Sequence, residues 1–121
     1  MNNATIYYVD FNGNKGSEIN NIHLGIIFKL PKINNMVFCV PLTSPKEKHF
    51  KTYNGFINRN HLDLKYQNLV YIEESDSIAL LDQMRTISVK RLVNVNKNEL
   101  NNDTKKLLGV KITKYMKHIL K

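Results

Sequence analysis

Short apolar runs separated by turn-forming residues occupy the first third of the chain. Residues 5–11 and 22–30 are rich in β-branched and aromatic side chains, and turn formers at 12–14 close the first run. A third apolar run, residues 36–42, follows the turn-like segment 31–35. This pattern predicts three strands, of which the second and third form the core hairpin.

The middle of the chain is more polar and less regular. Residues 45–67 show no sustained period, which predicts a long excursion able to hold a short hairpin or a helical turn. Short apolar runs at 69–72 and 77–81 flank an acidic turn. Residues 83–89 then alternate, with Arg85 and Ile87 on one face and Thr86 and Ser88 on the other. Residues 90–95 lead towards a final strand.

The C-terminal part, from Lys97 to Lys121, has helical periodicity. Asn96 or Asn98 is suited to cap the helix, with Glu99 three residues after Asn96 as in a capping box. Gly109 allows a division into two helices. Apolar residues recur at helical spacing, and lysines occupy the opposite face (Lys105, Lys106, Lys111, Lys114, Lys117 and Lys121).

Together these elements predict an α+β, mainly β fold: a small curved sheet, a long polar loop and a C-terminal amphipathic helix. A length of 121 residues suits one domain, residues 1–121. The lone cysteine, Cys39, lies in an apolar run, which is typical of a core residue in a reducing compartment. The chain has neither an apolar stretch of membrane-spanning length nor a signal-like N-terminus, so we expect a cytoplasmic location.

The formal net charge of +8 comes from one part of the chain. Residues 84–121 hold ten basic residues against Glu99 and Asp103, whereas residues 1–83 balance eight basic residues with eight acidic ones. Concentrated positive charge attracts polyanions, so nucleic acid is the first partner to consider. A basic helix face that is only solvated is the alternative.

The candidate chemistry centres on the end of the third apolar run. Thr43 and Ser44 stand there between two prolines, and Lys46, Lys48 and His49 follow. The four histidines show no paired spacing and no second cysteine exists, so a metal site is not indicated. Phosphate-binding glycine loops and a serine-hydrolase elbow are also missing.

Hydroxyls, lysines and histidines without a metal suit RNA cleavage by the RNA's own 2′-hydroxyl. That reaction needs a base, an acid and donors that stabilise the extra negative charge of the transition state. Thr43 and Ser44 can hydrogen-bond phosphate oxygens, and lysine or arginine can stabilise the charge. His23 and His49 are candidates for proton transfer, because imidazole titrates near neutrality.

Three motifs in register resemble the MazF/PemK-type ribonuclease toxins. They are residues 16–18 after the first strand, residues 41–44 at the end of the third, and residues 76–77 followed by the run 82–92, DQMRTISVKRL. The resemblance covers residues 7–92. It implies a compact SH3-like barrel with a C-terminal helix, a metal-independent endoribonuclease without cofactors that leaves a 2′,3′-cyclic phosphate, and an antitoxin that blocks it.

The stretch LTSPKEKH, residues 42–49, is also similar to the ToxN/AbiQ/CptN branch, whose toxins are neutralised by a structured RNA. That likeness implies active-site roles for Thr43, Ser44 and Lys46. Both a toxin–RNA assembly and a homodimer, as in the protein-neutralised relatives, remain open. The charge of +8 favours this branch, because capture of a folded RNA needs many phosphate contacts.

One departure concerns the start of the second strand. Protein-neutralised relatives carry an arginine–proline pair there, whereas this chain has Ile22 and His23. His23 is a candidate catalytic group for acid–base work, and the alternative is that it only shapes the pocket. Arg85 has two open roles, catalytic or structural. We expect RNA contacts from a set of basic residues: Lys48, His49, Lys51, Arg85, Lys105 and Lys111.

Three other functions remain open from the sequence. A type II toxin neutralised by a protein antitoxin would share the same motifs. A non-catalytic RNA-binding module would use Tyr53, Phe56 and Tyr66 as stacking platforms. A gyrase-poisoning toxin would share the barrel topology and act through its C-terminal helix.

Overall fold

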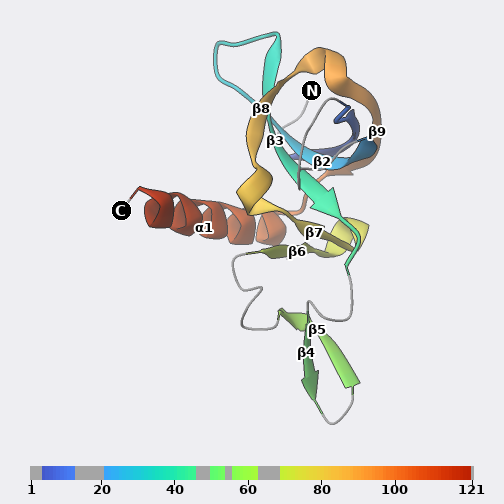
Figure 1. Cartoon of the computed structure of the whole chain (residues 1–121), viewed down its shortest axis with the longest axis vertical. Helices are drawn as coiled ribbons and strands as arrows, with labels where there is room; N and C mark the ends of the chain where they lie inside the picture. The colour runs from blue at the N-terminus through green and yellow to red at the C-terminus, as the bar shows by residue number, and fades with distance from the viewer. Residues whose placement is uncertain (1–3, 13–20, 46–49, 54–55, 63–68, 121) are drawn as a thin grey trace.

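The computed structural model describes residues 4–12, 21–45, 50–53, 56–62 and 69–120; at 50–53, 56–62 and 97–98 it describes the backbone alone. Its main feature is an antiparallel sheet of seven strands with the order β6-β7-β3-β2-β1-β9 and with β8 beside β3 (Figure 1). The strands are β1 (Thr5–Asp10), β2 (Ile22–Lys29), β3 (Met36–Thr43), β6 (Val70–Ile72), β7 (Ser77–Ala79), β8 (Arg85–Ser88) and β9 (Leu92–Glu99). The mainly β, α+β fold predicted from the sequence is confirmed.

The sheet packs on both faces because apolar residues alternate along β1, β2 and β3. Ile6, Ile26 and Val40 are cross-strand neighbours and belong to one buried cluster. Ile27 and Cys39 are also paired, one residue along, and belong to a second cluster. Since successive side chains in a strand point to opposite faces, the two clusters lie on the two sides of the curved sheet.

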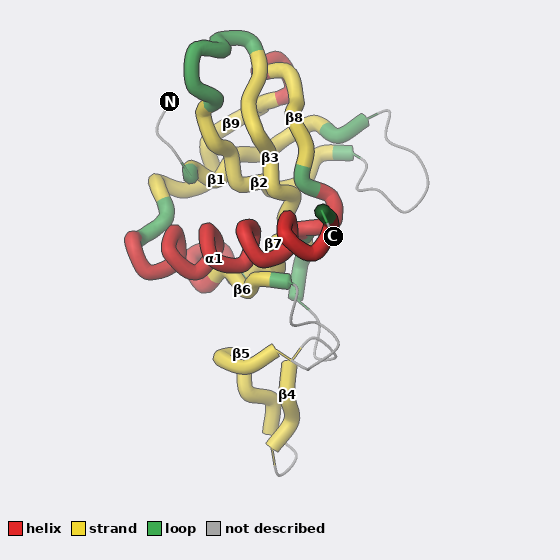
Figure 2. The backbone as a smooth tube through the Cα atoms, turned by 90° about the vertical axis from the view of Figure 1, so that its left-hand side faces the viewer, coloured by secondary structure: helices red, strands yellow, loops and turns green. Residues whose placement is uncertain are grey.

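Helix α1 (Asn102–Ile119) covers the first of these clusters. Leu100 and Leu108 are buried in that cluster, and Ile112 and Tyr115 pack against it. Figure 2 shows α1 running beside β6 and β7. The helix is continuous, so Gly109 does not divide it in two.

The helix begins later than the sequence predicted. Its N-cap is Asn101, whose side chain accepts a hydrogen bond of 2.8 Å from the Thr104 N–H, so Asn96 and Asn98 were the wrong caps. Residues 97–99 belong instead to β9, where Glu99 pairs with Thr5. The segment that resembled a capping box therefore forms part of a strand and not the start of the helix.

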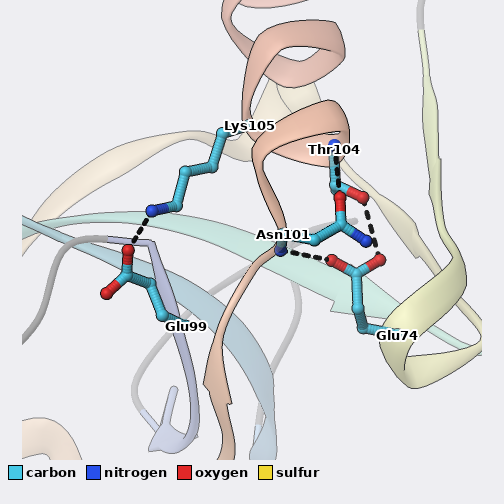
Figure 3. A network of polar contacts seen from close by, with 5 residues as sticks. All are labelled: Glu74, Glu99, Asn101, Thr104 and Lys105. Carbon is cyan, nitrogen blue, oxygen red and sulfur yellow. Dashed lines mark hydrogen bonds and ion pairs between the residues drawn. The ribbon is translucent and has the colours of Figure 1, made fainter.

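A carboxylate from another part of the chain completes the cap. Glu74, in the 3₁₀ helix η3 (Glu73–Ser75), accepts hydrogen bonds from the Asn101 N–H at 3.1 Å and from the Thr104 hydroxyl at 2.9 Å (Figure 3). Negative charge is favourable at a helix N-terminus, where backbone N–H groups lack partners. These contacts fix the start of α1 against the β6–β7 connection.

The polar excursion contains the short hairpin that the sequence left open. Strands β4 (Phe50–Tyr53) and β5 (Phe56–Leu62) form a separate two-stranded sheet.

In the part of the chain that is described, no helix has the length and apolar character needed to span a membrane.

Candidate functional site

Thr43 and Ser44 lie where β3 changes partners. The pairing of β3 with β2 ends at Pro41, which is opposite Gly25, and β3 then pairs with β7 through Leu42 and Thr43. The Pro41 carbonyl accepts a hydrogen bond of 2.8 Å from the Leu80 N–H. The proline thus ends one ladder without ending the strand, because a proline lacks the N–H that a ladder needs. Thr43 is half-buried and Ser44 is exposed.

His23 lies at the same end of the β2–β3 hairpin. It precedes Gly25 by two residues, and Thr43 follows Pro41 by two residues, so both lie equally far beyond the last β2–β3 pair. The His23 side chain is exposed, and its backbone pairs with Val9 of β1. His23 and Thr43 therefore both follow the same end of the β2–β3 ladder, but on strands that pair there with different neighbours, β1 and β7.

Tyr71 is a polar residue near these hydroxyls that the sequence did not single out. It pairs with Ile78, and Ile78 pairs with Thr43, so the three residues form one row across β6, β7 and β3. Residues opposite one another in antiparallel strands share a face, and two strand spacings separate Tyr71 from Thr43 by roughly 10 Å. The Tyr71 hydroxyl donates a hydrogen bond of 2.5 Å to Asp76 Oδ1.

The turn after η3 explains why Asp76 and Ser77 stand where they do. Asp76 has a φ of 46°, in the left-handed region that aspartate tolerates better than most residues, and its N–H donates to the Glu73 carbonyl. The Ser77 hydroxyl donates to the Ser75 carbonyl at 3.0 Å. The aspartate–serine pair of the sequence motif therefore builds a turn, and its aspartate orients Tyr71.

Arg85 lies apart from Thr43. It pairs with Cys39, and Thr43 lies four residues further along β3, a distance of roughly 13 Å. The Arg85 guanidinium lies 5.1 Å from the centre of the Phe11 ring, a cation–π arrangement, and the side chain is half-buried. Phe11 itself is almost fully buried.

Arg85 and Arg91 both line a groove of about 290 Å³. Arg91 supports the backbone at the end of β1. Its Nη1 donates hydrogen bonds to the Asp10 carbonyl at 3.1 Å and to the Asn12 carbonyl at 2.9 Å. These bonds join the 3₁₀ helix η5 (Val89–Arg91) to the end of β1. The groove therefore presents one arginine stacked on an aromatic ring beside another that supports the backbone.

Cys39 is not a nucleophile in this fold. Its side chain is fully buried, and burial raises the pKa of the thiol from 9.0 to about 12, although the nearby Arg85 charge opposes that rise. Because the thiolate is the reactive form, a pKa this high leaves the thiol inert. The expected core role of Cys39 is confirmed.

Three of the basic residues proposed to contact RNA have described side chains, and they lie on two different elements: Arg85 on β8, and Lys105 and Lys111 on α1. Lys105 forms an ion pair with Glu99 at the start of α1. Lys111 lies half-buried further along the same helix. Lys51 belongs to β4, where only the backbone is described, and three further residues lie outside the described ones (Lys46, Lys48 and His49). The loop motif 16–18 is outside them as well.

Across the described ranges, no three His, Cys, Asp or Glu residues are grouped closely enough to hold a metal ion. The described candidates are the hydroxyls of Thr43 and Ser44 at the end of β3, the His23 imidazole near the start of β2, and the Tyr71 phenol, which is held by Asp76.

Comparison with known families gives one match. A model of the family described as "PemK-like, MazF-like toxin of type II toxin-antitoxin system" matches residues 2–115. No curated protein matches the chain. The family match covers nearly the whole sequence, including every residue of the site described above.

Proposed function

Because the chain belongs to the PemK-like, MazF-like toxin family of type II toxin–antitoxin systems, we propose that it is a metal-independent endoribonuclease toxin. Toxins of this family are generally endoribonucleases. The observation that carries the proposal is the match over residues 2–115. The cytoplasm, where both mRNA and an antitoxin are found, stays the expected location.

The proposed reaction is an internal transfer of the phosphodiester. The 2′-oxygen of one nucleotide attacks the adjacent phosphorus, the P–O5′ bond breaks, and a 2′,3′-cyclic phosphate and a 5′-hydroxyl result. One proton leaves the 2′-hydroxyl for a base, and another reaches the departing O5′ from an acid. The transition state carries extra charge on the non-bridging oxygens, which pre-positioned donors stabilise.

We assign these roles to residues at the end of β3 and the start of β2. Thr43 and Ser44 donate hydrogen bonds to the non-bridging oxygens, Lys46 stabilises the developing charge, and His23 transfers a proton. The β2–β3 register supports this grouping, because His23 and Thr43 lie equally far beyond the last pair of the hairpin. Tyr71, oriented by Asp76 in the same row as Thr43, adds a hydroxyl oxygen that can contact the neighbouring nucleotide.

The test is cleavage of a defined single-stranded RNA in the presence of EDTA. We expect fragments that end in a 2′,3′-cyclic phosphate, identified by mass spectrometry, and no cleavage when 2′-deoxy residues replace the ribonucleotides. Activity that requires an added metal, or fragments with a 3′-hydroxyl, would contradict the proposed chemistry.

Matched variants test whether cleavage depends on the Thr43 hydroxyl or only on the shape of the side chain. Thr43→Val removes the hydroxyl and keeps a β-branched residue opposite Ile78, whereas Thr43→Ser keeps the hydroxyl. We expect a loss of about 100-fold or more in cleavage rate for Thr43→Val and a small loss for Thr43→Ser. For the imidazole, His23→Asn is compared with His118→Asn, an exposed histidine in the last turn of α1.

The family match gives less direct support for the nature of the antitoxin than for the ribonuclease activity. The matched family is described as type II, in which the antitoxin is a protein, so we propose a protein antitoxin. An RNA antitoxin, which we expected from residues 42–49 and from the charge of +8, is supported only by those two sequence features. Purification from the native operon without nuclease distinguishes them: a bound acidic protein supports type II, and a discrete small RNA supports the alternative.

A further inference from the structure

The lysines of α1 fall into two groups by their position around the helix. With 3.6 residues per turn, Lys105 and Lys111 lie about 60° to either side of the buried Leu108, whereas Lys117 lies about 180° from it. The first two are half-buried at the margins of the packed face, and Lys105 pairs there with Glu99. The residues that we expected to contact RNA are therefore at the less accessible margins of the helix.

The outward face of α1 carries a different set of lysines around a groove. The groove has a volume of about 740 Å³, and the described residues that line it all belong to this face: Lys106, Gly109, Val110, Thr113, Lys114 and Lys117. All three lysines are exposed. Within α1, whose 18 residues are all described, Asp103 in the first turn is the one acidic residue. Beyond that turn the outward face carries positive charge alone.

We propose that this face of α1 binds the backbone of a single-stranded RNA outside the cleavage site. Lys106 to Lys117 span eleven residues, roughly 16 Å of helix axis, which suits contact with a few successive phosphates. Lysine contributes a point charge on a flexible stem and reads phosphate without reading base sequence. The inference rests on the proposed ribonuclease function for the identity of the polyanion.

The composition of the groove favours RNA over a protein partner. Protein interfaces centre on large apolar or aromatic anchors. Here Val110, 65% exposed, is the one apolar side chain among the described lining residues. Gly109 and Thr113 are small, and the Thr113 hydroxyl donates a hydrogen bond to the Gly109 carbonyl. These two residues therefore place no bulky side chain between the lysines. The groove therefore admits a charged backbone, whereas the other exposed apolar residues of α1 and its C-cap lie outside its described lining (Leu107, Met116, Ile119 and Leu120).

The experiment compares two double variants with the same loss of charge. Lys114→Gln/Lys117→Gln removes two lysines from the groove. Lys32→Gln/Lys90→Gln removes two exposed lysines from the β2–β3 turn and from η5, away from α1. The ligand is a fluorescent 20-nucleotide RNA with 2′-O-methyl groups at every position, which cannot be cleaved by 2′-hydroxyl attack. Binding is measured by anisotropy at several salt concentrations.

For the groove variant we expect the slope of log K against log salt to fall by about 1.4, and affinity at 0.1 M salt to drop roughly 20-fold. The control variant should change the slope by less than half as much. Equal changes in both variants, or no change in either, would overturn the proposal and leave the lysines as a solvated face. A groove variant that loses binding to an acidic antitoxin while keeping RNA affinity would assign this face to a protein.

Cleavage of a short RNA keeps this test separate from that of the proposed function. The groove variant should cleave a five-nucleotide RNA within about twofold of the native rate, because so short a strand gains little from a second site. If the native protein binds the 2′-O-methyl RNA through α1 and cleaves nothing, the ribonuclease proposal fails and this one stands. If the native protein cleaves RNA and the two double variants bind the 2′-O-methyl RNA equally well, the α1 proposal fails and the ribonuclease proposal stands.

Discussion

We expect replacement by alanine to change the stability of the protein in opposite directions at two glycines. A Cβ atom at Gly25, in β2, would lie 2.9 Å from the Cys39 Sγ and 3.3 Å from the Val9 Cγ2. A Cβ atom at Gly109, in α1, would meet no atom within 4 Å. Neither glycine has a φ in the left-handed region, so the space around each one decides the result.

For Gly25→Ala we expect a loss of stability of about 1–3 kcal/mol. Overpacking a core by one methyl group costs that much, and the gain of about 0.4–1 kcal/mol from a less flexible unfolded chain does not offset it. The clash is with a thiol that is fully buried within the second apolar cluster, so there is little room for it to move. For Gly109→Ala we expect a gain of about 0.8–1 kcal/mol, the difference in helix propensity.

Urea unfolding followed by circular dichroism measures both changes, and a thermal scan checks their sign. The Gly25→Ala/Cys39→Ala double variant tests the cause, because it removes the sulfur that the new methyl group would meet. In the Cys39→Ala background we expect the cost of Gly25→Ala to fall by at least about 1 kcal/mol. A Gly25→Ala protein as stable as the native one, or a cost unchanged in that background, would refute the packing argument.

Three further predictions concern side chains with described surroundings. Cys39 should react with iodoacetamide at pH 8 roughly 1,000-fold more slowly in the folded protein than in urea, because a pKa raised from 9.0 to about 12 lowers the thiolate fraction by that factor. The same shift means that folding stability is lost as the pH rises above 9, which Cys39→Ala should lessen. Glu74→Ala should cost about 1–2 kcal/mol in urea unfolding through the lost cap of α1, whereas Glu73→Ala, an exposed neighbour in η3, should cost under about 0.5 kcal/mol. Arg91→Gln should cost about 1 kcal/mol through two lost hydrogen bonds to β1, with Lys90→Gln as the nearly neutral control, and equal effects at both sites would contradict that role.

The strands could be predicted from the sequence because their pattern is local. Alternation along β1, β2 and β3 reflects burial on each side of the sheet, so residues such as Ile26 and Ile27 reveal two packed faces without knowledge of the fold. The start of α1 could not be predicted in the same way. Asn96 and Glu99 match a capping box, but pairing of Glu99 with Thr5 is a long-range interaction that no local pattern encodes.

The candidate site shows the same division. Thr43 and Ser44 could be found from the prolines around them, and the position of His23 opposite that end follows from the predicted hairpin. Tyr71 could not be found, because its place beside Thr43 depends on β7 pairing with both strands. The expected RNA contacts of Lys105 and Lys111 stay a prediction. Their charge is visible in the sequence, but their position at the margin of the packed face of α1 is set by the sheet.

The pairing of β9 with β1 has a consequence for how the protein folds. β1 has β2 on one edge and β9 on the other, with Thr5 opposite Glu99 and the Leu100 N–H bonded to the Ala4 carbonyl at 2.9 Å. The two strands are separated by most of the chain, so this contact has a high sequence separation and a large loop-closure cost. A nascent chain that has reached only β8 leaves an edge of β1 open. This edge of β1 can therefore be paired only after β9 has been made, and we expect the sheet to be completed late in synthesis.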